Sequence, residues 1–197
     1  MIGVIDYGAG NQRNVVLALR RLGVQNRIIE KPDEFRGVKG VIFPGVGAAR
    51  SAMERLEATG LSEALRMYRG PFLGICLGMQ LLVEFSEEQD IPCLGILHGR
   101  TSRFPPRDKI PHMGWNAVSI RHPSALFRGV EDGSYCYFVH SYFVQPAEQS
   151  AVLAVTNYIV EFASAVEVGN LMGVQFHPEK SGDVGLTILR NFYELCL

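Results

Sequence analysis

The 197-residue sequence predicts one α/β domain over residues 1–197, with an open, mostly parallel sheet, helices on both faces and a partly antiparallel second half. Three observations lead to this fold class. In the first half of the chain, short apolar strands alternate with amphipathic helices, a pattern typical of right-handed βαβ units. The second half is rich in strands joined by short turns. The length, with 47% hydrophobic and 20% charged residues, fits one ordinary domain with a core to fill.

The first half contains expected strands that are separated by expected helices. Most of these strands are largely apolar, as strands buried on both faces of a parallel sheet should be. The first helix is expected because glycines and an asparagine precede an amphipathic repeat. We expect strands at 2–6, 26–30, 40–45 and 71–76, and helices at 8–23, 48–57 and 61–68.

The second half is expected to form short strands and to end in a helix. Residues 168–170, Val-Gly-Asn, suit a tight hairpin loop between two of these strands. The proline-rich, basic segment 100–116 predicts an ordered surface loop rather than a linker. We expect strands at 95–104, 115–120, 134–144, 151–160 and 162–176, and a final helix at 183–195.

Charge, hydropathy and cysteine usage exclude several classes of function. A net charge of −1 gives no reason to expect nucleic-acid binding or attraction to an anionic membrane. No apolar run approaches the roughly 18–20 residues of a membrane-spanning helix, and the N-terminus lacks the basic leader of a signal peptide. The cysteines are far apart and lack zinc-type spacing, so we expect a cytoplasmic protein with reduced thiols and without metal or cofactor. They are Cys76, Cys93, Cys136 and Cys196.

The stretch PFLGICLGMQLL, residues 71–82, gives the first indication of chemistry. Glycines stand two residues before and two residues after Cys76, where a strand should pass into a helix over 77–85. In open α/β sheets, chemistry takes place at the carboxyl ends of the strands. Gly74-Ile75-Cys76-Leu77-Gly78 therefore matches a nucleophile elbow, which presents its central residue on a strained turn and leaves the next N–H free to bind an oxyanion. The alternative is a buried structural cysteine.

The segment MGVQFHPEKS, residues 172–181, offers a base for such a nucleophile. His177 follows an apolar strand, and Glu179 comes two residues later. In an extended chain these two side chains face the same way, so the carboxylate could orient the imidazole as in a Ser–His–Asp triad. The alternative is a solvated His-Pro-Glu turn.

The segment FPGVGAA, residues 43–49, ends a strand in a loop with two glycines before a helix. It matches neither the dinucleotide-binding fingerprint nor the P-loop, because no lysine-serine pair follows. A second source of oxyanion N–H groups fits this loop better than a helix-start loop or a weak phosphate-binding loop.

The segments around Cys76 and around His177 and Glu179 resemble the class I, or triad, glutamine amidotransferases over nearly the whole chain. The resemblance implies a flavodoxin-like α/β fold, and hydrolysis of glutamine to glutamate and ammonia through a glutamyl thioester on Cys76. The segments IGVIDYGAGN, PGVGA, PHMGWN and FVHSYFV are similar to those of glutaminase subunits that pass ammonia to a separate cyclase subunit, a (β/α)8 barrel. A heterodimer is therefore implied.

The same resemblance implies roles for individual residues. Cys76 is the nucleophile, His177 the general base and then acid, and Glu179 the residue that orients the imidazole. The oxyanion N–H groups come from Leu77 and from the loop with Val46 and Gly47, which in the family needs a peptide flip to point an N–H inward. The residues expected to hold the amino-acid end of glutamine are Gly47, Gln80, His140, Ser141 and Tyr142. The positions that match the family's cyclase-facing surface are Asn11, Met113, Trp115 and Lys180.

Three alternatives stay open at this point. The chain could be a stand-alone glutaminase that serves another synthase, such as pyridoxal-phosphate synthase, although PHMGWN and PGVGA weigh against it. It could be a Cys-His hydrolase of the DJ-1 or dienelactone-hydrolase type, which would be indifferent to glutamine analogues. It could also be a flavodoxin-like binding module, in which Cys76→Ala would leave every activity intact.

Overall fold

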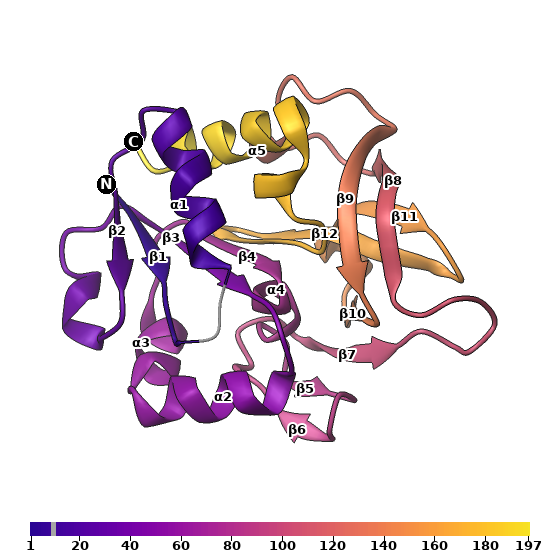
Figure 1. Ribbon diagram of the computed structural model, residues 1–197, viewed down its shortest axis with the longest axis horizontal. Coiled ribbons are helices and arrows are strands. Elements are labelled where there is room, and N and C mark those ends of the chain that lie inside the picture. The colour runs from indigo at the N-terminus through magenta and orange to yellow at the C-terminus, as the bar shows by residue number, and fades with distance from the viewer. Residues whose placement is uncertain (9–10) are drawn as a thin grey trace.

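The computed structural model describes residues 1–8 and 11–197. It shows a central sheet between two layers of helices (Figure 1). Within the described residues this sheet has nine strands in the order β2-β1-β3-β4-β13-β12-β11-β8-β9. They are β1 (Ile2–Ile5), β2 (Asn26–Ile29), β3 (Gly40–Gly45), β4 (Phe72–Cys76), β8 (His112–Ile120), β9 (Ser134–His140), β11 (Val152–Asn157), β12 (Glu161–Val168) and β13 (Leu171–Val174).

The central sheet is parallel in one half and antiparallel in the other. From β2 to β13 every neighbouring pair is parallel, and the order of these five strands is that of a flavodoxin-like sheet. From β13 to β9 every pairing is antiparallel. β4 and β13 are hydrogen-bonded neighbours, although most of the second half of the chain separates them in sequence. The expected fold class is confirmed.

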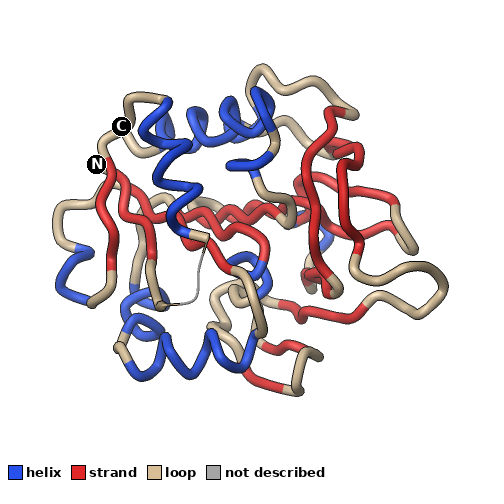
Figure 2. Tube along the Cα trace, in the orientation of Figure 1, coloured by secondary structure: helices blue, strands red, loops and turns tan. Residues whose placement is uncertain are grey.

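Helices cover both faces of the sheet (Figure 2). α1 (Gln12–Arg21) and α5 (Gly182–Leu195) lie on one face, and α2 (Ala49–Ala58) and α3 (Leu61–Met67) on the other. Side chains four residues apart, such as Val15 and Leu19 of α1, are fully buried against the sheet, as an amphipathic helix requires. Each face has its own apolar core, because neighbouring strand residues alternate between the two sides. Short 3₁₀ helices occupy Pro32–Phe35, Ala125–Phe127, Gln149–Ala151 and Pro178–Lys180.

A smaller sheet of four strands, in the order β10-β7-β5-β6, adjoins the second half of the chain. The expected strand at 134–144 is divided at Ser141: β9 belongs to the large sheet and the following strand to the small one. The two shortest strands were not predicted, because two-residue strands have no detectable alternation. The four strands are β5 (Phe85–Ser86), β6 (Ile91–Pro92), β7 (Gly99–Arg103) and β10 (Tyr142–Pro146).

The helix expected over 77–85 is wrong in length. α4 comprises only Leu77–Gln80, a single turn. The carbonyls of Leu81 and Leu82, which would continue the helical ladder, instead accept hydrogen bonds from the backbone N–H groups of Leu94 and Ile96 at 3.0 and 2.8 Å. The loop at 94–97 therefore replaces the helical partners that the apolar pattern led us to expect.

Several boundaries also differ from expectation. The expected surface loop at 100–116 is irregular only over 104–111, because β7 covers its start and β8 its end. The strand expected at 95–104 begins at Gly99, and α1 begins at Gln12; residues 9–10 of the expected helix lie outside the described residues. The hairpin at 168–170 is confirmed, since Val168 pairs with Leu171.

Among the described residues we find no helix with the length and hydrophobicity that a membrane-spanning helix requires.

Candidate active site

Cys76 lies at the carboxyl end of β4, at the point where the chain turns into α4. Its backbone has φ 53° and ψ −111°, a conformation that residues other than glycine rarely adopt. Such strain persists only where the surrounding structure imposes it, and it concentrates at functional sites. The turn thus has the backbone geometry of a nucleophile elbow.

The two glycines that flank Cys76 are required by close backbone packing. A Cβ on Gly78 would lie 1.8 Å from the carbonyl oxygen of Phe43 in β3, and a Cβ on Gly74 would lie 2.8 Å from the backbone nitrogen of Met79. Both partners are backbone atoms, which cannot rotate away. The glycines therefore allow α4 to pass directly over β3 and β4 and so fix the position of the elbow.

His177 and Glu179 form a buried pair directly after β13. The His177 Nδ1 lies 2.8 Å from the Glu179 Oε1, and the two side chains are 1% and 0% exposed. We had expected the pair to form along an extended chain, and this expectation is wrong. Pro178, Glu179 and Lys180 make a 3₁₀ turn, and the Ser181 hydroxyl closes it by donating to the His177 carbonyl at 2.7 Å.

Cys76 and His177 face the same cavity, which has a volume of about 300 Å³. Burial lowers the pKa of His177, but its hydrogen-bond and charge interactions with Cys76 and Glu179 outweigh burial and raise that pKa to about 10. Because Nδ1 is occupied by Glu179, the ring Nε2 is the nitrogen that remains to exchange a proton with Cys76. The structure thus brings together the three side chains expected to form a triad, from two neighbouring strands.

The cavity also collects the other residues predicted to bind substrate or an oxyanion. Leu77 is the first residue of α4, where an N–H has no acceptor within the helix. Gly47 has φ +96°, a left-handed conformation that suits glycine. The predicted residues that line the cavity are Val46, Gly47, Leu77, Gln80, His140, Ser141 and Tyr142.

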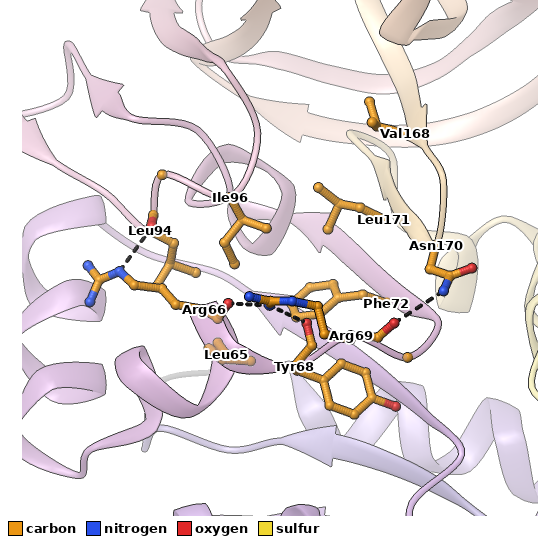
Figure 3. A pocket seen from close by; sticks show the side chains of 12 residues that line it. Leu65, Arg66, Tyr68, Arg69, Phe72, Leu94, Ile96, Val168, Asn170 and Leu171 are labelled. Atoms are coloured by element: carbon orange, nitrogen blue, oxygen red, sulfur yellow. Dashed lines mark hydrogen bonds between the residues drawn. The ribbon is translucent and has the colours of Figure 1, made fainter.

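A second cavity, of about 510 Å³, opens at the opposite ends of β4 and β13 (Figure 3). Two arginines on its wall bind backbone carbonyls: Arg66 Nε donates to Leu94 at 3.0 Å, and Arg69 Nη1 donates to Arg66 at 2.6 Å. None of the residues predicted for the site lies in this cavity. The chemistry therefore points to the smaller one.

Comparison with known proteins identifies the family. The model of the family "Glutamine amidotransferase class-I" matches residues 3–196. The chain belongs to the class I glutamine amidotransferases.

Curated members of this family are similar over nearly their whole length. The chain is 50% identical to the imidazole glycerol phosphate synthase subunit HisH of Moorella thermoacetica, over 98% of this chain and 94% of that protein. It is 46% identical to the protein of the same name in Methanothermobacter thermautotrophicus, over 99% of this chain and 98% of that protein.

Solved structures share the fold at low sequence identity. A putative GMP synthase protein from Thermoplasma acidophilum superposes with a TM-score of 0.77 at 21% identity, covering 99% of this chain and 92% of that one. PurLQS from Thermotoga maritima gives a TM-score of 0.73 at 20% identity, covering 98% and 97%. At such identities the likeness concerns the fold alone.

The residues expected at the partner interface of this amidotransferase fall into two groups. Met113 and Trp115 are 61% and 55% exposed on the outer surface of β8. Lys180 places its Nζ 5.6 Å from the centre of the Tyr137 ring, and Tyr137 also packs against Trp115. Asn11 is different, because its side-chain amide donates to the Glu179 carboxylate. Asn11 therefore belongs to the surroundings of the triad as well as to the surface next to it.

Three residues near the thiol were missed in the sequence. Glu88 lines the cavity, but it stands within the acidic stretch EFSEEQD, where nothing distinguishes it. Gln175 is fully buried and donates from its Nε2 to the Cys76 Sγ at 3.6 Å. Tyr7 is buried under the predicted oxyanion loop, and burial raises its pKa. Of these three residues, Gln175 had one signal in the sequence: it precedes His177 by two residues.

Proposed function

We propose that this chain is the glutaminase subunit of imidazole glycerol phosphate synthase in histidine biosynthesis. It hydrolyses L-glutamine and delivers the ammonia to a separate cyclase subunit, a (β/α)8 barrel, which makes imidazole glycerol phosphate and AICAR. One observation carries the proposal: Cys76 and His177 line one cavity and Glu179 pairs with His177, in a chain about half identical to HisH proteins over nearly its whole length.

Glutamine binds in the cavity of about 300 Å³ beside Cys76. Its amino-acid end contacts Gln80 and the segment from His140 to Tyr142, which line the cavity together with Cys76. Glu88 supplies a carboxylate to this cavity, and it pairs with the α-ammonium group of the substrate. One of its oxygens already accepts from the Ala49 backbone N–H at 2.8 Å, which holds the side chain in place.

Catalysis starts from the state in which His177, as general base, has already taken the thiol proton of Cys76, which its raised pKa favours. The sulfur then attacks the side-chain carbonyl carbon of glutamine. The carbonyl electron pair moves to the oxygen, which the N–H groups of Leu77 and of the Val46–Gly47 loop stabilise. The tetrahedral intermediate then expels the amide nitrogen, which takes the proton from His177 and leaves as ammonia. A glutamyl thioester remains on Cys76.

Hydrolysis of the thioester repeats these steps with water. His177 removes a proton from the water molecule, the resulting hydroxide attacks the thioester, and the sulfur leaves and regains a proton from the imidazolium. Glutamate is released. Glu179 stabilises the imidazolium in both halves, since its carboxylate lies 2.8 Å from Nδ1. Splitting amide hydrolysis into two steps lowers each barrier.

The ammonia imposes a requirement on the assembly. Near neutral pH, free ammonia is almost wholly ammonium, which is not a nucleophile, so it must reach the cyclase through a sheltered path. We therefore place the cyclase against the surface of Met113, Trp115 and Lys180, with Asn11 between that surface and the triad. The complex is a cytoplasmic heterodimer, and residues 1–197 form its single amidotransferase domain.

Control by the partner follows from the oxyanion loop. Removing one oxyanion donor costs about 10²–10³ in kcat in comparable enzymes. If the Val46–Gly47 peptide points its N–H inward only in the loaded complex, the isolated subunit is nearly inactive. Glutamine is then not wasted when the cyclase has no substrate.

The test is a glutaminase assay of the wild type and Cys76→Ser, each alone and with the cyclase subunit and its nucleotide ligand. We expect wild-type activity to rise at least about 100-fold in the loaded complex, and Cys76→Ser to be inactive throughout. Activation by a pyridoxal-phosphate synthase subunit instead would assign the chain to that enzyme. Strong activity of the isolated chain, unaffected by the cyclase, would contradict the proposed control.

A further inference from the structure

Gln175 lies next to the nucleophile because of the register between β4 and β13. Val174 of β13 pairs with Ile75 of β4, so the next residues along each strand are Gln175 and Cys76. The Gln175 side chain is fully buried, and its Nε2 lies 3.6 Å from the Cys76 Sγ. Its backbone N–H donates to Ser164 of β12 at 2.9 Å, which fixes the residue from the other side. Gln175 does not line the substrate cavity.

The orientation of the Gln175 carboxamide is determined by its other neighbour. Gln80 donates from its Nε2 to the backbone carbonyl of Tyr142 at 2.8 Å and to the Gln175 Oε1 at 3.0 Å. A backbone carbonyl only accepts hydrogen bonds, so the Gln80 nitrogen must face it. The oxygen of Gln175 therefore faces Gln80, and its N–H group faces the sulfur.

The Tyr142 carbonyl is itself held by a chain of buried side chains. His140 Nδ1 donates to it at 2.7 Å, so His140 Nε2 is an acceptor and takes a hydrogen bond from His112 Nδ1 at 3.0 Å. His112 Nε2 then accepts from Asn116 Nδ2 at 3.2 Å, and that amide also donates to a backbone carbonyl, that of Asn157.

Both histidines in this chain are neutral near pH 7. Burial lowers the pKa of His112 to about 4 and that of His140 to about 3. Each ring therefore carries a single N–H, and each hydrogen bond has one direction. The network runs without a break from a backbone carbonyl on β11 to the thiol, and every donor in it is assigned.

We propose that Gln175 is a positioning residue for the Cys76 nucleophile, whose carboxamide N–H donates to the sulfur and favours the thiolate over the thiol. This inference rests on the proposed role of Cys76. A thiolate accepts a hydrogen bond more strongly than a thiol, so the N–H lowers the energy of the attacking species. The same N–H stabilises the thiolate that forms when the sulfur leaves the thioester. His177 thus transfers the proton, and Gln175 positions the sulfur of Cys76.

The test compares Gln175→Met with the wild type by the rate at which iodoacetamide alkylates Cys76, followed by mass spectrometry of the Cys76 peptide. Methionine keeps the length of the side chain but has no N–H to donate. We expect alkylation at pH 7 to slow about tenfold, which corresponds to about 1.4 kcal/mol. The difference should disappear in alkaline buffer, where the sulfur is ionised in both proteins. Burial raises the pKa of Cys93, Cys136 and Cys196 to about 12, so these thiols react slowly.

Gln145→Met is the matched control. Gln145 lies on β10, and its Oε1 accepts from Ser102 at 2.8 Å, away from the thiol. This variant should alkylate like the wild type. With the partner subunit present, Gln175→Met should lower kcat for glutamine about tenfold and leave KM unchanged, because Gln175 does not line the cavity.

Equal alkylation rates at pH 7 for folded Gln175→Met and wild type would overturn the inference, and so would a slowing of the same size at every pH. If Gln175→Met does not fold, Gln175→Asn answers the same question, because its amide is one methylene too short to reach the sulfur. The alkylation readout does not depend on glutamine. A wild type without glutaminase activity in the loaded complex would therefore refute the proposed function and still leave the role of Gln175 decided.

Discussion

Replacement of Gly78 by alanine tests whether the packing of the elbow determines activity. The new Cβ would lie 1.8 Å from the Phe43 carbonyl oxygen, whereas real Cβ contacts essentially never fall below 3.0 Å. α4 and β3 must therefore separate by more than an ångström. Overpacking of this kind costs about 1–3 kcal/mol, and the higher helix propensity of alanine returns at most about 1 kcal/mol. We expect a net loss of about 1–2 kcal/mol in the free energy of unfolding.

The effect of Gly78→Ala on catalysis should be larger than its effect on stability. A displacement of about 1 Å at a reacting centre costs on the order of 10² in rate, so kcat of the loaded complex should fall about 100-fold. Urea denaturation and the glutaminase assay measure the two effects separately.

Gly23→Ala is the control for Gly78→Ala. Its Cβ would meet no atom within 4 Å, but φ is +70°, which costs alanine about 1 kcal/mol. The two variants should therefore lose similar stability, and only Gly78→Ala should lose activity. Wild-type kcat in Gly78→Ala would refute the reasoning.

Four further predictions concern charge and the partner surface. Glu179→Gln keeps an oxygen that accepts from His177 but removes the negative charge, so kcat should fall about 10–100-fold, and unchanged kcat would contradict the proposed role. The pKa of His177 is raised from 6.5 to about 10, so its contribution to stability is complete below pH 6.5 and is lost as the pH rises through 10. Urea denaturation at several pH values should show this decline in the wild type and not in His177→Gln. The pKa values of His112 and His140 are lowered to about 4 and about 3, so between these values and pH 6.5 the folded state binds fewer protons than the unfolded chain. The free energy of unfolding should therefore fall as the pH drops from 6.5 towards 4, and it should fall less steeply in His112→Phe. Trp115→Ala should weaken binding of the cyclase subunit at least tenfold in a titration while the urea midpoint stays unchanged, and unaltered affinity would exclude this surface.

The parallel half of the fold was predictable because its signals are local. Strands β1, β3 and β4 are apolar, fully buried runs, and the helices between the strands repeat with the helical period. The second half was less predictable, since the division of 134–144 at Ser141 depends on which sheet each part joins. The short length of α4 depends on hydrogen bonds from residues 94–97, and no local pattern encodes these.

The candidate site shows the same distinction. Cys76, His177 and Glu179 carry chemistry in short motifs, so sequence reasoning found them. The 3₁₀ turn that joins His177 to Glu179 was not foreseen, because a proline between them fits an extended chain equally well. Gln175 and Glu88 were missed because amide and carboxylate side chains acquire a role only through neighbours that are distant in the sequence.

One topological feature accounts for the site as a whole. β4 and β13 are adjacent and parallel, so the nucleophile at the end of one and the base at the end of the other leave the sheet at the same edge. The chain between these strands builds the antiparallel half and returns at Tyr142, whose carbonyl binds Gln80 above the thiol. The cavity residues His140, Ser141 and Tyr142 therefore come from the chain between β4 and β13, whereas Cys76 and His177 stand at the ends of these two strands. The same stretch of chain carries the exposed Met113 and Trp115 on β8. A partner bound to these two side chains would contact the strand pair β8 and β9. These strands also hold His112 and His140, which belong to the hydrogen-bond network that ends at Cys76.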